Sequence, residues 1–255
     1  MKKDKIAAQL YTLREFLKTE EDIFYSLKKV SEIGFQAVQI SGIGKIEPKR
    51  LKEICDEFDL KVCATHIPFE RLKTELDNVV EEHKILGCSH IAIPSAPSEY
   101  RSEEGALKFA QECNKIGKKL KEEGITLSYH NHSFEFKKYG GKTWLEILIE
   151  NSSPEYLMIE IDTYWVQFAG ANPEKWIRSL EGRILLVHLK DMGMIEDFKQ
   201  TMFEVGYGNL DWDGIIASCN EAGVEWYIIE QDVCQRSPFE SLKMSFDFLT
   251  KNYLD

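Results

Sequence analysis

The stretch EIGFQAVQI at residues 32–40 leads from the end of a helix-like segment, through a glycine, into a short apolar run. The same kind of junction recurs as ILGCSHIAI at 85–93, EGITLSY at 123–129 and AGVEWYII at 222–229. Each is typical of a helix that ends at a glycine and is followed by a strand. The repetition therefore predicts helices and strands that alternate along the chain.

Extending this pattern predicts eight strands, near residues 6–11, 37–41, 61–66, 89–94, 125–130, 156–162, 184–189 and 225–230. Several of them are nearly continuous apolar runs, as strands covered on both faces are. Helices are expected between the strands over Asp22–Ile33, Pro48–Phe58, Arg71–Leu86, Glu103–Glu123, Pro173–Leu180 and Asp211–Ala222, with a last helix opening at Ser237.

Eight strands that alternate with helices, at a spacing of roughly 25 to 35 residues, favour the α/β class and a closed parallel barrel. No linker rich in Gly, Ser or Pro divides the chain, so residues 1–255 are expected to form a single (β/α)8 TIM-barrel domain. The rival, an open doubly wound sheet, usually carries a glycine-rich phosphate loop after its first strand. Here that strand continues as QLYTLR at 9–14.

Composition excludes several classes of protein. The chain of 255 residues is 43% hydrophobic, which is enough for a large core, and its formal net charge of -11 disfavours binding to nucleic acid. No segment approaches the ~20 apolar residues of a membrane helix, so a cytoplasmic protein without a membrane partner is expected. The 6 cysteines include no Cys-x-x-Cys pair and are expected to be reduced and mostly buried.

Histidines and carboxylates gather where strands are predicted to end. In a barrel of this class the reacting groups lie at the carboxyl ends of the strands. Two histidines fail this criterion, because His83 falls in a helix and His90 at the opposite end of its strand. Imidazole nitrogens and carboxylate oxygens that converge from successive strands suit a divalent ion such as Mn²⁺, Co²⁺, Zn²⁺ or Mg²⁺. The groups at or just past strand ends are His66, His130, His132, Asp162, His188, Asp191, Glu230 and Asp232.

Each of these residues also has a purely structural interpretation. A histidine at a strand end is often only a hydrogen-bonding loop residue, and Asp162 could cap the turn that follows it. Only one of Glu160 and Asp162 is expected in a site. Lys190 and Asp191 could form an exposed ion pair, the usual fate of adjacent charges.

Seven pieces of the sequence, in their order and spacing, resemble the xylose isomerase-like TIM-barrel superfamily, and specifically its sugar phosphate isomerase/epimerase family. They are QLYTLR at 9–14, TH at 65–66, YHNHSFEF at 129–136, IDTYW at 161–165, HLKD at 188–191, GYGNLDW at 206–212 and IEQD at 229–232. The resemblance implies one divalent metal ion (Mn, Co, Zn or Mg) held by His130, Asp162, His188 and Glu230. In the ketose epimerases the fifth-strand ligand is a glutamate, and His130 is its nearest equivalent here.

The resemblance also implies an isomerase or epimerase that acts on a sugar, keto-sugar or polyol by proton abstraction next to a carbonyl. Glu230 with His130 or Lys190 would move the proton, and Glu135 is a further candidate. The expected substrate-binding residues are Tyr11, His66, His132 and Trp165.

The sequence leaves three alternatives to an isomerase or epimerase. The histidine-rich fifth strand also resembles the inosose dehydratases, which would make the protein a lyase on the same metal site, and a non-catalytic sugar-binding barrel is a third interpretation. The apurinic-site endonucleases of the superfamily are disfavoured by the negative charge. A small-molecule carbohydrate is the expected partner, a homo-oligomer is compatible with the sequence, and cationic residues spread over five loops argue against a phosphorylated substrate.

Overall fold

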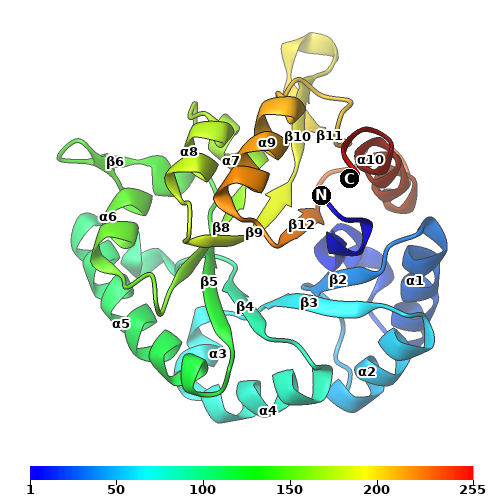
Figure 1. Cartoon of the computed structure of the whole chain (residues 1–255), viewed down its shortest axis with the longest axis horizontal. Helices are drawn as coiled ribbons and strands as arrows, with labels where there is room; N and C mark the ends of the chain where they lie inside the picture. Colours follow the sequence, from blue (N-terminus) through cyan, green and yellow to red (C-terminus); the bar gives the residue numbers. More distant parts are fainter. Residues whose placement is uncertain (255) are drawn as a thin grey trace.

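Eight parallel strands close into a barrel in the computed structural model, which describes residues 1–254 (Figure 1). The strands follow one another around the barrel in the order β1-β12-β9-β8-β5-β4-β3-β2. All eight predicted strands and the (β/α)8 TIM-barrel class are thereby confirmed. The strands are β1 (Ile6–Gln9), β2 (Ala37–Ile40), β3 (Lys61–His66), β4 (His90–Ile93), β5 (Thr126–His130), β8 (Met158–Asp162), β9 (Ile184–Leu189) and β12 (Trp226–Ile229).

Helices surround the barrel, as Figure 1 shows. They are α1 (Glu20–Ile33), α2 (Pro48–Glu57), α3 (Phe69–Thr74), α4 (Leu76–Leu86), α5 (Glu103–Glu122), α6 (Trp144–Asn151), α7 (Thr163–Phe168), α8 (Pro173–Ser179), α9 (Trp212–Ala222) and α10 (Pro238–Tyr253). The prediction of one continuous helix over Arg71–Leu86 is wrong, because Glu75 leaves the helical conformation (φ -134, ψ 31) and separates α3 from α4.

Two helices and two hairpins were not anticipated from the sequence. The helices α6 and α7 are short, and α6 begins at a capping box formed by Thr143 and Glu146. Two antiparallel hairpins pair β6 (Lys138–Tyr139) with β7 (Lys142–Thr143) and β10 (Asp191–Met194) with β11 (Gln200–Phe203).

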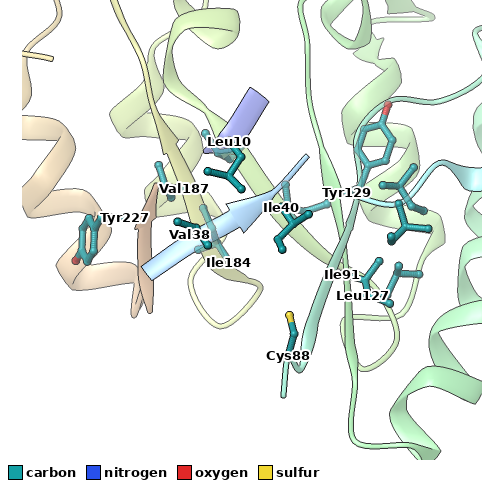
Figure 2. Packing of buried hydrophobic residues seen from close by; sticks show 14 of the residues in the cluster. Leu10, Val38, Ile40, Cys88, Ile91, Leu127, Tyr129, Ile184, Val187 and Tyr227 are labelled. Carbon is teal, nitrogen blue, oxygen red and sulfur yellow. The ribbon is translucent and has the colours of Figure 1, made fainter. Parts of the chain in front are cut away.

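Side chains alternate between the two faces of each strand, and this alternation builds two apolar clusters. The larger cluster packs between strands and helices; Figure 2 shows part of it, including Val38, Tyr129 and Val187. A smaller cluster lies inside the barrel and includes Ala7, Leu186 and Ile228. Toward the carboxyl ends, the inward positions of the strands carry polar side chains instead. The barrel therefore has an apolar floor and a polar upper interior.

The cysteines are reduced, as the sequence predicts. None of the cysteines is in a disulfide, and five of the six are buried. Among residues 1–254, no helix combines the length and apolar character needed to cross a bilayer.

Asp191 is fully buried and anchors the segment at residues 206–212. Its carboxylate accepts hydrogen bonds from the indole N–H of Trp212 and from four backbone N–H groups, those of Met192, Gly206, Gly208 and Leu210. A Cβ at Gly208 would collide with that carboxylate, which explains the glycine. The alternative interpretation of Lys190 and Asp191 as an exposed ion pair is therefore wrong: both side chains are buried, and each bonds to groups elsewhere.

Replacing Asp191 with alanine is expected to lower the free energy of unfolding by at least about 3 kcal/mol, because five N–H donors, among them the buried indole of Trp212, lose their acceptor. Urea denaturation followed by circular dichroism measures the change. The control is Glu196→Ala on the exposed part of the same loop, which should change stability by less than about 0.5 kcal/mol. Equal stability of the two variants would contradict the anchoring role.

Candidate functional site

The carboxyl ends of β5, β8, β9 and β12 bring His130, Asp162, His188 and Glu230 together. Each residue offers one ligand atom, and these four atoms all lie within 4.8 Å of one another. All four side chains are buried. His130 Nε2 lies 3.3 Å from Asp162 Oδ2, and His188 Nδ1 lies 2.7 Å from Glu230 Oε2. Ligand atoms that bind one ion at about 2.0–2.2 Å are at most ~4.4 Å apart, so small movements would place these four around a single cation.

Hydrogen bonds fix which ring nitrogen of His130 faces the cluster. His130 Nδ1 lies 3.2 Å from the carbonyl oxygen of Pro94. Because a carbonyl oxygen only accepts, Nδ1 donates to Pro94, and Nε2 is the ring nitrogen that faces Asp162. Metal-binding histidines are oriented in this way by their second nitrogen.

His188 is oriented by the same principle. Its Nε2 lies 2.6 Å from Gln39 Oε1, and the Gln39 amide nitrogen donates to Glu160 Oε1 at 2.8 Å, which turns the amide oxygen toward the imidazole. His188 Nε2 is therefore a donor, and Nδ1 faces Asp162 and Glu230. Two directed imidazole nitrogens and two carboxylates form a donor set that fits a divalent metal ion.

Glu160 lies beneath this cluster, one inward position before Asp162 on β8. Its Oε2 pairs with His66 Nε2 at 2.7 Å, and its Oε1 accepts from the Gln39 amide and lies 3.4 Å from His188 Nε2. One carboxylate therefore supports two imidazoles. Burial would raise the pKa of Glu160, but His188 and His66 outweigh burial and hold the pKa well below its ordinary value. Glu160 and Asp162 both point into the barrel at successive levels, and the expectation that only one of them belongs to the site stays a prediction.

Replacing Glu160 with glutamine is expected to weaken metal binding by about 10–100-fold, because an amide cannot accept from both Gln39 and His66. Competition with a fluorescent chelator measures the affinity, and circular dichroism checks the fold. Glu104→Gln, on the exposed face of α5, is the matched control. An affinity equal to that of this control would show that Glu160 does not support the site.

Lys190 places a buried ammonium group beside the cluster. Its Nζ lies 3.0 Å from Asp162 Oδ2, 2.7 Å from Glu230 Oε2 and 2.9 Å from Asp232 Oδ2. Burial would lower the pKa of Lys190, but the three carboxylates outweigh burial and hold it well above its ordinary value. The lysine is therefore charged and shared among three carboxylates.

Asp232, which the sequence places at a strand end together with Glu230, belongs to this group. Its side chain is 20% exposed, more than that of Glu230 at 5%. Burial and the neighbouring charge of Glu230 raise the pKa of Asp232 to about 6. Asp232 lies two residues after Glu230. In an extended chain this spacing puts both side chains on the same side, which is the sequence feature that predicts its position.

A cavity of 410 Å³ opens above Lys190 and Glu230. The four residues predicted to bind substrate all line it, together with His130, Lys190 and Glu230, whereas Asp162 and His188 lie deeper. Its full lining is Tyr11, Arg14, Ser41, His66, Pro94, Ser95, His130, His132, Trp165, Lys190, Glu230, Asp232 and Val233. Sequence reasoning missed Ser41, Ser95 and Val233, which carry no distinctive signal in their loops.

Two aromatic rings form one wall of this cavity. The centroids of the His132 and Trp165 rings are 5.4 Å apart. Within residues 1–254, His132 Nδ1 and Trp165 Nε1 are buried and have no hydrogen-bond partner. Burial lowers the pKa of His132 to about 3, so the ring is neutral.

Cations in the cavity are already paired. Arg14 and Lys190 both line the cavity. The sequence placed them in different loops, and the fold brings these loops together. However, Arg14 donates to the carbonyl oxygens of Tyr11 and Asp232, and Lys190 is bound to carboxylates. Neither is left over for a phosphate group.

Three other residues considered in the sequence analysis lie outside this cavity. His83 bonds to Thr65 Oγ1 at 2.7 Å from within α4, and His90 lies at the amino end of β4, as the sequence indicated. The Glu135 carboxylate accepts from the Tyr129 hydroxyl and the His132 backbone N–H and does not line the cavity.

Known proteins share both the sequence pattern and this architecture. Residues 27–251 match the family described as xylose isomerase-like TIM barrel. The inosose dehydratase of Mesomycoplasma hyopneumoniae is 31% identical over 161 residues, which cover 55% of this chain and 52% of that protein, so the chain spans about half the length of this curated relative.

Solved structures extend the likeness over nearly the whole chain. A sugar phosphate isomerase/epimerase from Parabacteroides distasonis superimposes with a TM-score of 0.81 at 25% identity, covering 99% of this chain and 96% of that one. An L-ribulose 3-epimerase shares the fold, with a TM-score of 0.74 at 14% identity and coverage of 96% and 93%. The chain belongs to the xylose isomerase-like TIM-barrel family.

Proposed function

We propose that the protein is a divalent-metal-dependent isomerase or epimerase that removes a proton from the carbon next to the carbonyl of a sugar, keto-sugar or polyol. The observation that carries this proposal is the four-donor cluster whose two imidazole nitrogens are directed inward by Pro94 and Gln39. His130, Asp162, His188 and Glu230 would hold the ion. When bound there, the ion would polarise the substrate carbonyl and stabilise the negative charge that develops on its oxygen.

Glu230 and Lys190 supply the proton-transferring groups on one side of the cavity. Burial would raise the pKa of Glu230, but Lys190 and His188 outweigh burial and hold the pKa well below its ordinary value, so the carboxylate is ionised and able to accept a proton. Lys190 Nζ, 2.7 Å from Glu230 Oε2, is placed to stabilise that carboxylate and to return a proton.

The imidazole side of the cavity completes the proposed site. His130 lines the cavity together with His132, so imidazole groups face the substrate beside Glu230 and Lys190. His66 and His132 would hydrogen-bond substrate hydroxyl groups, and Tyr11 and Trp165 would pack against the carbon face of the ring.

The second candidate function is a lyase that removes water after the same proton abstraction. The curated relative in Mesomycoplasma hyopneumoniae is named an inosose dehydratase. The pairing of a carboxylate with imidazoles, in place of two glutamates, supports this alternative, because an imidazole is a suitable acid for a departing hydroxyl group.

Isotope exchange tests both candidates. Protein stripped with a chelator is reloaded with Mn²⁺, Co²⁺, Zn²⁺ or Mg²⁺, and a panel of ketoses and inososes is incubated with it in D₂O. We expect metal-dependent loss of one carbon-bound proton signal in NMR spectra, and signals of a product that has lost water would identify a dehydratase. Binding of a sugar without metal-dependent exchange would overturn the enzymatic proposal and leave a binding protein.

A further inference from the structure

A second cavity, of 440 Å³, lies beside the first on the side of β2 and β3. Both cavities are lined by Ser41 and His66, so they meet at these residues. Ser41 Oγ lies 3.5 Å from His66 Nδ1, which makes the junction polar. Cavities that bind small ligands are about 300–1,000 Å³ in volume, so each of the two is large enough for a ring-sized group.

One wall of the second cavity is fixed in place. It consists of residues 41–47, which follow β2 and lead into α2 (Figure 1). The Gly44 backbone N–H donates to the carbonyl oxygen of Leu17 at 2.6 Å, and a Cβ at Gly44 would collide with the carbonyl of Lys18. Gly42, with a positive φ of 65°, lets the ring of Tyr11 lie against the backbone. The second cavity is therefore formed before any ligand binds.

The chemistry of the second cavity favours a neutral hydroxylated ring. Its charged groups are of both signs: Arg71 is paired with Glu75 and Glu82, and Lys45 is accompanied in the lining by Glu47, so the cations and carboxylates of the lining balance. Between these groups lie apolar side chains, among them Ile46 and Leu51. Polar groups of both signs beside apolar surface match the hydroxyl groups and the carbon face of a sugar.

We propose that the substrate carries two rings: the reacting ring lies over His130 and Glu230, and a second, neutral sugar ring occupies the cavity beyond Ser41 and His66. This inference rests on the proposed function, because that function places the reacting ring. It narrows the substrate class from a free monosaccharide to a disaccharide or glycoside.

The test compares one-ring and two-ring ketoses on the Mg²⁺-loaded protein. D-Fructose is the one-ring probe, and its glucosyl derivatives turanose, maltulose and isomaltulose present a second ring at different positions. Dissociation constants are measured by calorimetry. We expect at least one disaccharide to bind at least tenfold more tightly than fructose. If none does, the proposal is overturned.

Substitutions locate the second ring. Ile46→Trp fills the second cavity and should bring the ratio of fructose to disaccharide dissociation constants to about one. Ile149→Trp makes the same change in the groove between α6 and α8 and should leave the ratio unaltered. If Ile46→Trp does not fold, Lys45→Trp enters the same cavity from an exposed position.

If the ratio of fructose to disaccharide dissociation constants is unchanged when tryptophan fills the second cavity, the inference is overturned. Failure of the proposed function is separate: it shows as absence of metal binding and of proton exchange with every sugar, whatever the number of rings.

Discussion

Replacing Asp162 with asparagine is expected to weaken Mn²⁺ binding by more than about 100-fold and to reduce substrate proton exchange below detection. Asp162 is a charged ligand of the proposed ion, so its loss should exceed the ~10–100-fold effect typical of groups that only orient ligands. The fold should survive, because Asp162 Oδ1 accepts the Trp165 backbone N–H at 3.1 Å, and the amide oxygen of asparagine can take over this cap.

Competition with a fluorescent chelator gives the metal affinity, and NMR in D₂O gives the exchange rate. Asp77→Asn, an exposed position on α4, is the matched control. If Asp162→Asn binds Mn²⁺ and exchanges the proton as the control does, Asp162 is not part of the site and the proposed ion position is wrong.

The positions of the four clustered residues could be predicted because a barrel obeys one simple rule. The carboxyl ends of its parallel strands meet at one rim, so His130, Asp162, His188 and Glu230, each at or close to the end of an apolar run, had to approach one another. No knowledge of side-chain packing was needed. Strand periodicity alone also separated these residues from His90, which begins its strand.

The environment of Lys190 could not be predicted in this way. Beside Asp191 in the sequence, it has the pattern of an exposed ion pair, but its partners come from β8 and from the segment after β12. Asp191 in turn is satisfied by backbone groups of residues 206–212. Lys190 and Asp191 are each buried by contacts with residues far away in the chain. A local sequence pattern gives no information about such contacts.

The second cavity is beyond sequence reasoning for a similar reason. It exists because Gly44 lets residues 41–47 pack against the backbone of Leu17 and Lys18. A glycine in a loop predicts a turn, but it does not indicate which other loop approaches it.

Replacing Lys190 with methionine is expected to destabilise the metal-free protein by about 3–5 kcal/mol. Methionine nearly preserves the length of the side chain but removes the ammonium group, and Asp162, Glu230 and Asp232 are then left as mutually repelling buried carboxylates. Proton exchange should be lost as well, since the proposed mechanism uses the lysine. Lys175→Met, an exposed position on α8, is the control.

Metal should reverse the instability of Lys190→Met. Asp162 and Glu230 are shared between the ammonium group and the proposed ion, so removing the ammonium removes a positive charge that opposes the ion. The variant should therefore bind Mn²⁺ at least as tightly as the unmodified protein, and ligand binding raises stability according to RT ln(1 + [L]/Kd). Thermal unfolding with chelator and with excess Mn²⁺ tests this: the increase in Tm on adding metal should be larger in Lys190→Met than in the unmodified protein. A smaller increase would mean that the carboxylates around Lys190 are not those that hold the ion, and the lysine would then act through the fold alone.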